Sequence, residues 1–188
     1  MKLKMIKFKN VKSTNDEAIK LIKSNKTKPT IIHSYNQSKG RGTMGKKWIS
    51  KKGNIFLSIF FKMNIKKYDF KDFAIVNPHI IRGVLEMFSK YKVSVKWPND
   101  LLIKKKKVCG ILQETIEHKE SKYLIIGIGI NTKCAPISNS FKSISLLNCS
   151  NKKINNEDII LNIKISFEKF LSDINKYKLS YLKTRICR

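Results

Sequence analysis

Apolar and polar positions alternate along this chain in short segments that are typical of β-strands, and longer segments with a helical period lie between them. The strand-like segments predict strands at residues 4–11, 30–35, 55–62, 93–97, 101–103, 108–117 and 123–131. The amphipathic segments predict helices that follow residue 13 and that cover residues 70–90 and 157–170.

Local signals refine these elements. Thr14, with Glu17 three residues later, forms the capping-box pattern that opens a helix. Pro78 lies inside the second helical segment, where we expect either a kink or the entry to the helix. The lysine run 104–107 predicts the turn of a hairpin, because polar residues separate two apolar segments there.

The order of these elements mixes helices with hairpin-like strands, which is typical of an α+β domain. We therefore expect a mixed β-sheet with helices packed on one of its faces. A chain of 188 residues is long enough for one full core and short for two. Because no repeat or linker divides it, we expect a single domain over residues 1–188.

The formal net charge of +27 is the most unusual feature of the composition, and it suggests nucleic-acid binding. Only four of the 40 basic residues are arginines, however, and arginine is the side chain that base and phosphate recognition favour. The lysines are spread along the whole chain. This pattern indicates a lysine-biased composition, so we expect no specific nucleic-acid partner, only non-specific attraction to polyanions at low salt.

Composition also limits the compartment and the metal chemistry. No apolar stretch reaches the roughly 18 residues that a membrane span needs. The N-terminal residues lead into no apolar signal segment, so we expect a cytoplasmic protein with no membrane partner. The cysteines are too far apart for a redox or metal motif, so we expect reduced thiols and no metal site: Cys109, Cys134, Cys149 and Cys187.

The loop at residues 37–48 is the first candidate site, because it holds three glycines and four cations. Glycines let the backbone approach a ligand and donate its N–H groups, while Arg41, Lys46 and Lys47 add positive charge. Such a loop suits a phosphate or an acyl phosphate. Its spacing matches neither a Walker loop nor a dinucleotide fingerprint. A flexible basic surface loop would have the same composition, and the loop alone does not separate these two interpretations.

A second candidate site follows the rigid corner Trp97-Pro98. Asp100 comes directly after this corner, and Lys107 follows it by seven residues. If the segments 101–103 and 107–112 pair as a hairpin, Asp100 and Lys107 lie near each other across the pair. An aspartate beside a lysine in a cleft can remove a proton and stabilise an anion. The alternative is an exposed ion pair on a surface hairpin.

Together these segments resemble the biotin protein ligase family. The related lipoate ligases share the fold, but the Gly-Arg-Gly loop and the Lys-Trp-Pro-Asn-Asp segment resemble the biotin branch. The matching segments occur in the family's order and spacing over residues 13–131: Ser13-Thr14-Asn15, Gln37 with Gly40-Arg41-Gly42, Gly45 and Trp48, Lys96-Trp97-Pro98-Asn99-Asp100, Lys107 with Gly110-Ile111-Leu112, and Gly127-Ile128-Gly129-Ile130-Asn131.

The resemblance implies an ATP-dependent ligase that forms biotinyl-5′-adenylate and transfers biotin to a lysine of the biotin carboxyl carrier protein of acetyl-CoA carboxylase. Magnesium would accompany ATP as the counter-ion of its phosphates. The implied catalytic residues are Lys107, Asp100 and Arg41. The implied binding residues are Ser13, Thr14 and Gln37 at the ureido ring with Asn15 beside them, Gly40, Arg41, Gly42 and Thr43 at the carboxylate and phosphate, Lys107 at the carboxylate and adenylate, and Asn131 in the nucleotide pocket.

Two departures from the family pattern matter. Further arginines are usual in the loop where this chain has Thr43, Met44 and Lys46, so we expect weaker retention of the adenylate. The chain begins close to the first expected strand and stops at Arg188, so we expect neither the helix-turn-helix domain nor the small C-terminal β-barrel of other members. The alternatives are a lipoate or octanoate transferase of the same fold, a basic nucleic-acid-binding protein, and a truncated, inactive ligase.

Overall fold

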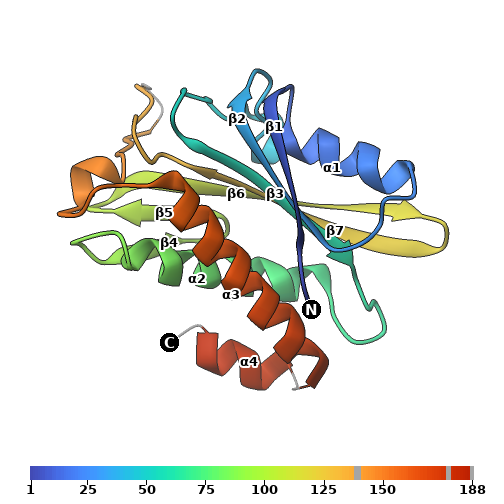
Figure 1. Ribbon diagram of the computed structural model, residues 1–188. Coiled ribbons are helices and arrows are strands. Elements are labelled where there is room, and N and C mark those ends of the chain that lie inside the picture. The colour runs from blue at the N-terminus through green and yellow to red at the C-terminus, as the bar shows by residue number, and fades with distance from the viewer. Residues whose placement is uncertain (138–140, 177–178, 187–188) are drawn as a thin grey trace.

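A seven-stranded mixed sheet, in the order β1-β2-β3-β7-β6-β5-β4, forms the centre of the molecule (Figure 1). The computed structural model describes residues 1–137, 141–176 and 179–186, so Cys187 and Arg188 lie outside the described residues. β1 and β2 are parallel, and the other neighbouring strands are antiparallel. The strands are β1 (Lys4–Val11), β2 (Thr30–Gln37), β3 (Ile55–Lys62), β4 (Val93–Lys96), β5 (Asp100–Ile103), β6 (Lys106–His118) and β7 (Ser121–Ile130).

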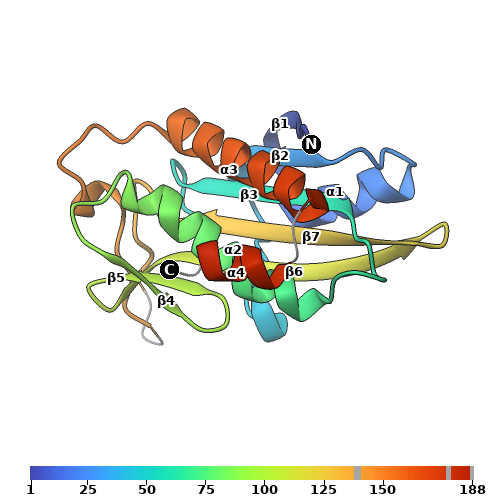
Figure 2. The ribbon, with the colours of Figure 1, turned by 90° about the horizontal axis from the view of Figure 1, so that it is seen from below.

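Helices cover both faces of this sheet (Figures 1 and 2). α1 (Thr14–Lys23) packs on one face, where Ala18 and Ile22 form a small core with sheet residues. The other face carries the larger core and the remaining helices, α2 (Phe70–Glu86), α3 (Asn156–Lys176) and α4 (Leu179–Ile186). The α+β class with a mixed sheet is therefore confirmed, whereas the expectation that helices cover one face is wrong.

The sequence of β3 explains this two-sided arrangement. All of its residues except Lys62 are buried. Leu57, Ile59 and Phe61 belong to the larger core, and Phe60 belongs to the small core under α1. A strand that is covered on both faces has a continuous apolar sequence and not an alternating one. The apolar run of β3, which only Ser58 interrupts, is thus the sequence feature that is typical of a sheet buried on both sides.

Several predicted boundaries differ from the structure. β1 and β3 begin and end where expected, but α2 ends at Glu86, and α3 starts at Asn156 and continues to Lys176. α4 was not predicted. The turn between β5 and β6 is shorter than the lysine run 104–107. Within that run only Lys104 and Lys105 have positive φ values, 50° and 61°. A two-residue turn of this kind fits the twist of a hairpin, and it leaves Lys107 inside β6.

The predicted capping box of Thr14 and Glu17 is wrong, because α1 starts one residue earlier. Ser13 is the N-cap in an extended conformation, and its hydroxyl accepts a hydrogen bond from the backbone N–H of Asp16 at 3.4 Å. The N–H of Thr14 is free for another partner, Oε1 of Gln37 at 2.9 Å. The start of α1 is therefore tied to the end of β2.

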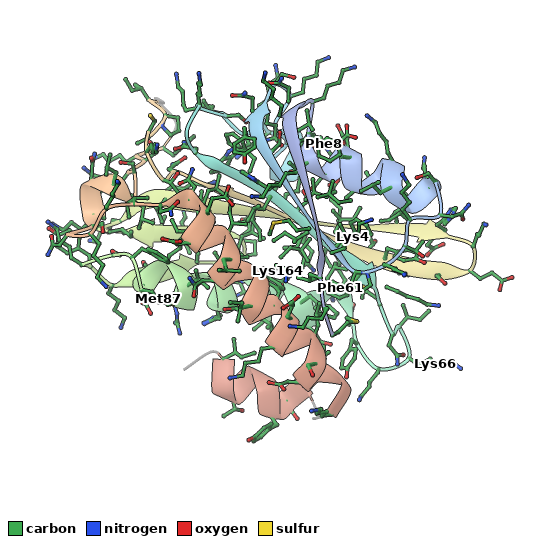
Figure 3. The ribbon with its side chains drawn as sticks, viewed as in Figure 1. Lys4, Phe8, Phe61, Lys66, Met87 and Lys164 are labelled. Atoms are coloured by element: carbon green, nitrogen blue, oxygen red, sulfur yellow. The ribbon has the colours of Figure 1, made fainter. Side chains whose placement is uncertain are left out.

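Lysine side chains project from the surface around the outline of the molecule, with Lys66 in the segment after β3 as one example (Figure 3). This spread agrees with a lysine-rich composition and not with one localised basic face. Within the described residues, no helix has the length and apolar character that crossing a bilayer requires.

We predict that Phe60→Ala lowers the free energy of unfolding by about 3–5 kcal/mol, because it empties a fully buried site between α1 and the sheet. Urea unfolding monitored by circular dichroism measures this change. Leu161→Ala on α3, where the side chain is half exposed, is the control and should change the value by less than about 1 kcal/mol. Equal losses in both variants would contradict the assignment of a second core.

Candidate active site

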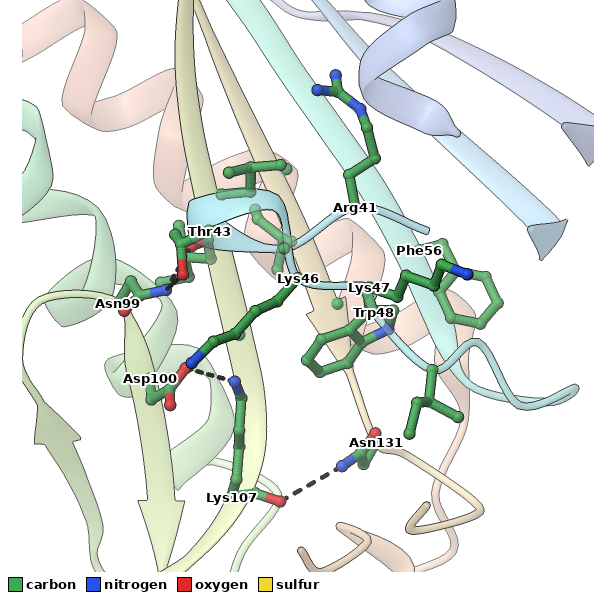
Figure 4. A pocket seen from close by; sticks show the side chains of 18 of the residues that line it. Arg41, Thr43, Lys46, Lys47, Trp48, Phe56, Asn99, Asp100, Lys107 and Asn131 are labelled. Atoms are coloured by element: carbon green, nitrogen blue, oxygen red, sulfur yellow. Dashed lines mark hydrogen bonds and ion pairs between the residues drawn. The ribbon is translucent and has the colours of Figure 1, made fainter. Parts of the chain in front are cut away.

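A cavity of about 1010 Å³ lies where the start of α1, the glycine loop, the β5–β6 hairpin and the end of β7 meet (Figure 4). The residues singled out from the sequence converge on this cavity, although they come from distant parts of the chain. Gly40 is not among the residues that line it. The lining includes Ser13, Thr14, Asn15, Gln37, Arg41, Gly42, Thr43, Asp100, Lys107 and Asn131.

The wall of the cavity at the start of α1 is built from buried polar side chains. Thr14 and Asn15 are almost fully buried, and the hydroxyl of Ser58 lies 2.8 Å from Oγ1 of Thr14 and also contacts Oδ1 of Asn15. Gln37 closes the group, because its amide contacts both Thr14 and Ser50. These groups have donors and acceptors oriented by one another, as buried polar groups require.

A glycine in β7 makes room for this polar wall. A Cβ atom at Gly127 would lie 2.5 Å from Oδ1 of Asn15, which is closer than any real contact. A larger residue would therefore displace Asn15 from the cavity wall.

The glycine loop folds back on itself at its base. The N–H of Gly42 donates to the carbonyl of Lys46 at 2.7 Å, and the N–H of Trp48 donates to the carbonyl of Gly40 at 3.0 Å. The turn at the tip has positive φ at Met44 and Gly45, 54° and 72°. Glycine accepts this conformation without strain, and the side chain of Met44 is exposed.

A neutral contact joins the loop to the hairpin region. The amide of Asn99 donates to the hydroxyl of Thr43 at 3.3 Å and to the carbonyl of Ile111 at 3.2 Å. Thr43 therefore connects the loop to the segment that precedes Asp100. From the same loop, Lys46 points toward the end of the cavity that holds Asp100 and Lys107 (Figure 4).

Asp100 and Lys107 form an ion pair in which Nζ of Lys107 lies 2.6 Å from Oδ1 of Asp100. Each side chain is about one fifth exposed, 21% for Asp100 and 20% for Lys107. The hairpin pairs Asp100 with Gly110 and Leu102 with Lys107, with a bulge between. The predicted proximity is confirmed, and the pair lines the cavity and is not an exposed surface pair.

Arg41 lies in the loop base, but its guanidinium is already paired with carboxylates. Nη1 and Nη2 donate to the two oxygens of Glu114 at 2.7 and 2.8 Å, and Nη2 lies 3.0 Å from Oδ1 of Asp16. Figure 4 shows the side chain pointing away from Asp100 and Lys107. The positive groups nearest that ion pair are therefore lysines and not Arg41.

Trp48 provides the surface beneath Lys107. Its indole lies against Gly110 and Gly129, where a Cβ atom would come within 2.7 and 2.4 Å of the ring. Nζ of Lys107 lies 5.4 Å from the centre of this ring and 5.6 Å from that of Phe141, distances at which a cation is attracted to an aromatic face. The indole N–H of Trp48 is buried and has no hydrogen-bond partner among the described residues.

The backbone around Lys107 is held by the end of β7. The amide of Asn131, which is buried, donates to the carbonyl of Lys107 at 3.3 Å, and its N–H donates to the carbonyl of Val108 at 2.8 Å. The neighbouring Cys109 is fully buried, and burial raises the pKa of its thiol far above the usual range. Cys109 thus stays protonated and is not a nucleophile of this cavity.

Sequence reasoning missed four residues that shape this cavity. Glu114 and Asp16 have no local sequence signal of a partner, since Arg41 lies 73 residues away from Glu114 in the chain. Phe141 comes from a segment with no motif. Ser58 did give a signal, because it is a polar residue inside an apolar strand, and such a residue needs a buried partner.

The model of the Biotin/lipoate A/B protein ligase family matches residues 7–131 of this chain. This range contains the residues that line the cavity from Ser13 to Asn131. The chain belongs to this family. The resemblance drawn from the motifs is therefore confirmed at the family level.

Relatives within the family are similar over most of this chain. The bifunctional ligase/repressor BirA of Bacillus subtilis (strain 168) is 31% identical over 167 residues, which cover 86% of this chain and 51% of the relative. The chain thus spans about half the length of the curated BirA proteins of Bacillus that it matches.

Solved structures agree with this family assignment. The biotin protein ligase from Aquifex aeolicus in complex with biotin and ATP has a TM-score of 0.80 and 28% identity, covering 97% of this chain and 76% of that one. A Plasmodium falciparum protein in complex with lipoate has a TM-score of 0.64 at 12% identity, over 92% of this chain and 62% of that one. This second likeness shows the fold alone.

We predict that Gly129→Ala in this ligase-family chain lowers stability by about 1–3 kcal/mol, because its Cβ would overlap the Trp48 indole. Chemical unfolding measures the loss, and tryptophan fluorescence reports the displaced ring. Gly83→Ala in α2 is the matched control, since a Cβ there meets nothing within 4 Å and the helix favours alanine. The prediction is wrong if both glycine variants are as stable as the parent protein.

Proposed function

We propose that this chain activates biotin with ATP and transfers it to a lysine of the biotin carboxyl carrier protein of acetyl-CoA carboxylase. One observation carries the proposal: a single cavity has a buried polar wall at one end and the Asp100–Lys107 ion pair at the other. The first end suits a small polar ring, and the second suits a carboxylate and a phosphate. The cytoplasm, where carboxylases and ATP occur together, is the compartment that we assign.

The polar wall supports biotin over lipoate as the substrate. A ureido ring has one carbonyl and two N–H groups, so it needs donors and acceptors when it is buried. Ser13, Thr14 and Gln37 offer hydroxyl and amide groups of both kinds at this end, with Asn15 beside them. The dithiolane ring of lipoate has no N–H or carbonyl, so it could not exchange hydrogen bonds with this polar wall.

The ion-pair end suits the activation step. A biotin carboxylate oxygen attacks the α-phosphorus of ATP, and pyrophosphate leaves. Two anions must meet in this step, so cations lower the barrier by reducing their repulsion. In this proposal Lys107 contacts the carboxylate and the adenylate, which is supported by its position in the cavity lining beside Lys46 and Lys47. ATP enters as its magnesium complex, in which the ion belongs to the substrate.

The transfer step requires a neutral amine. The carrier lysine attacks the carbonyl carbon of the mixed anhydride, the C–O bond to the phosphate breaks, and AMP leaves. In this proposal Asp100 orients the amine and accepts its proton, which is supported by the ion pair that holds its carboxylate beside Lys107. Asn131 lines the nucleotide side of the cavity and holds the backbone of Lys107.

The glycine loop retains the adenylate in this proposal, with Gly40 and Gly42 at its base and Thr43 at its contact with Asn99. Gly40 is tightly packed, since a Cβ there would lie 2.7 Å from Gln37, Ser50 and Trp48. The loop offers backbone N–H groups and lysines in place of further arginines. Point charges on lysines hold a phosphate with less geometric precision than a guanidinium fork, so retention is weaker than in arginine-rich loops.

The proposal is tested by incubating the protein with MgATP and either biotin or lipoate, followed by mass spectrometry of the released adenylate. Biotinyl-adenylate and biotinylation of a purified carrier domain are the expected products. Lipoyl-adenylate alone would assign the chain to the lipoate branch. No adenylate with either acid would contradict ligase activity of this chain.

We predict that Lys107→Ala slows single-turnover formation of biotinyl-adenylate by at least about a hundredfold, as expected for the loss of a charged transition-state contact. Lys106→Ala is the matched control, because Lys106 is the exposed neighbour on the same strand and points to the opposite face. A Lys107→Ala rate within a few-fold of the Lys106→Ala rate would remove Lys107 from the chemistry.

A further inference from the structure

Glu114, in the middle of β6, joins two parts of the cavity wall that are distant in the sequence. Its Oε1 accepts from Nη1 of Arg41 at 2.7 Å. Its Oε2 accepts from Nη2 of Arg41 at 2.8 Å and from Nδ2 of Asn15 at 2.6 Å. One carboxylate therefore holds both the base of the glycine loop and the first turn of α1. The pairing with Arg41 is the bidentate form, which fixes geometry as well as charge.

A second carboxylate completes the surroundings of the guanidinium. Oδ1 of Asp16, on α1, lies 3.0 Å from Nη2 of Arg41. The single positive charge of Arg41 thus faces two negative charges, and these side chains are only partly exposed, 37% for Arg41 and 26% for Glu114. To reach a phosphate, the guanidinium would have to leave both carboxylates.

The backbone at Arg41 shows what this arrangement holds in place. Arg41 and Lys47 form an isolated antiparallel bridge, and the hydrogen bonds Gly42 N–H to Lys46 and Trp48 N–H to Gly40 lie on either side of it. Arg41 is therefore at the closed base of the loop, at the point where the two ends of the loop pair with each other. An ion pair at this base fixes the position of the whole loop relative to β6 and α1.

We infer that Glu114 anchors the glycine loop through Arg41, so that Arg41 acts as a positioning residue and not as a phosphate-binding cation. The positive charge at the acyl-phosphate end then comes from Lys107, Lys46 and Lys47. Because Asn15 shares the same carboxylate, the anchor also couples the loop to the polar wall that receives the ring of the substrate. The consequence for adenylate retention rests on the proposed function, whereas the anchoring of the loop does not.

The two possible roles of Arg41 predict opposite results for a change at Glu114. If Arg41 binds phosphate directly, Glu114→Gln releases the guanidinium, and adenylate retention is unchanged or improved. If Glu114 is the anchor, Glu114→Gln weakens retention as Arg41→Gln does. The glutamine keeps the shape of the side chain and an acceptor for Asn15, so the change removes mainly the charge.

The first measurement is hydrogen exchange in the ligand-free protein, which needs no activity. We expect Glu114→Gln and Arg41→Gln each to speed exchange of the Gly42, Lys46 and Trp48 amides by about tenfold, the scale of a lost charge-assisted contact. Glu157→Gln is the matched control. It removes the carboxylate of another ion pair, with Lys7 at 2.6 Å, on the surface of α3, and it should leave these amides unchanged.

The second measurement is the rate of biotinyl-adenylate release in a chase experiment. Each single variant should raise this rate about tenfold, and the double variant should release no faster than either, because the two side chains act as one unit. Weakened retention in Arg41→Gln but not in Glu114→Gln would overturn the anchor in favour of direct contact. Unchanged exchange in Glu114→Gln would overturn it outright. A parent protein that forms no adenylate, yet shows the faster exchange in the variants, would refute the proposed function and leave the anchor standing.

Discussion

The indole of Trp48 rests on a cross-strand pair of glycines, and the arrangement of the cavity depends on this contact. Gly110 in β6 and Gly129 in β7 face each other in register, and a Cβ on either would overlap the ring. The sheet thus has a gap in its side-chain layer that one aromatic residue fills. Trp48 is the last residue of the glycine loop, so the packing of its indole on the sheet brings the loop over Lys107. The ammonium of Lys107 lies 5.4 Å from the ring centre.

Two groups of opposite charges lie near Trp48, and they differ in whether a substrate can reach them. Lys107 and Asp100 face the cavity, and a substrate that separates them gains a cation for its anion and a carboxylate for its amine. Arg41 with Glu114 and Asp16 is a closed arrangement in which each charge already has a partner. The first pair suits chemistry, and the second suits positioning.

How much of this could be read from the sequence depended on how far apart the partners lie in the chain. The proximity of Asp100 and Lys107 followed from a hairpin of local residues, and strand pairing fixes such distances. The Glu114–Arg41 pair joins a strand to a loop 73 residues earlier, and no local pattern encodes it. The same limit applies to the covering of both sheet faces. We expected helices on one face, although the apolar run of β3 is typical of a strand that is covered on both, and that run does not encode which helix lies on each face.

The lysines that line the cavity affect the proposed transfer step, an effect that the overall composition does not reveal. Cations lining the cavity outnumber its one acidic lining residue, Asp100, within the described residues. Such a field would attract the anionic substrates that we propose, ATP and the biotin carboxylate. It also acts on the carrier lysine that must enter later. Nearby positive charge lowers the pKa of an incoming ammonium group, because the charged form is repelled. The free amine, which alone is nucleophilic, is therefore favoured at the point of attack, and Asp100 is the one acid in the lining that can take the proton.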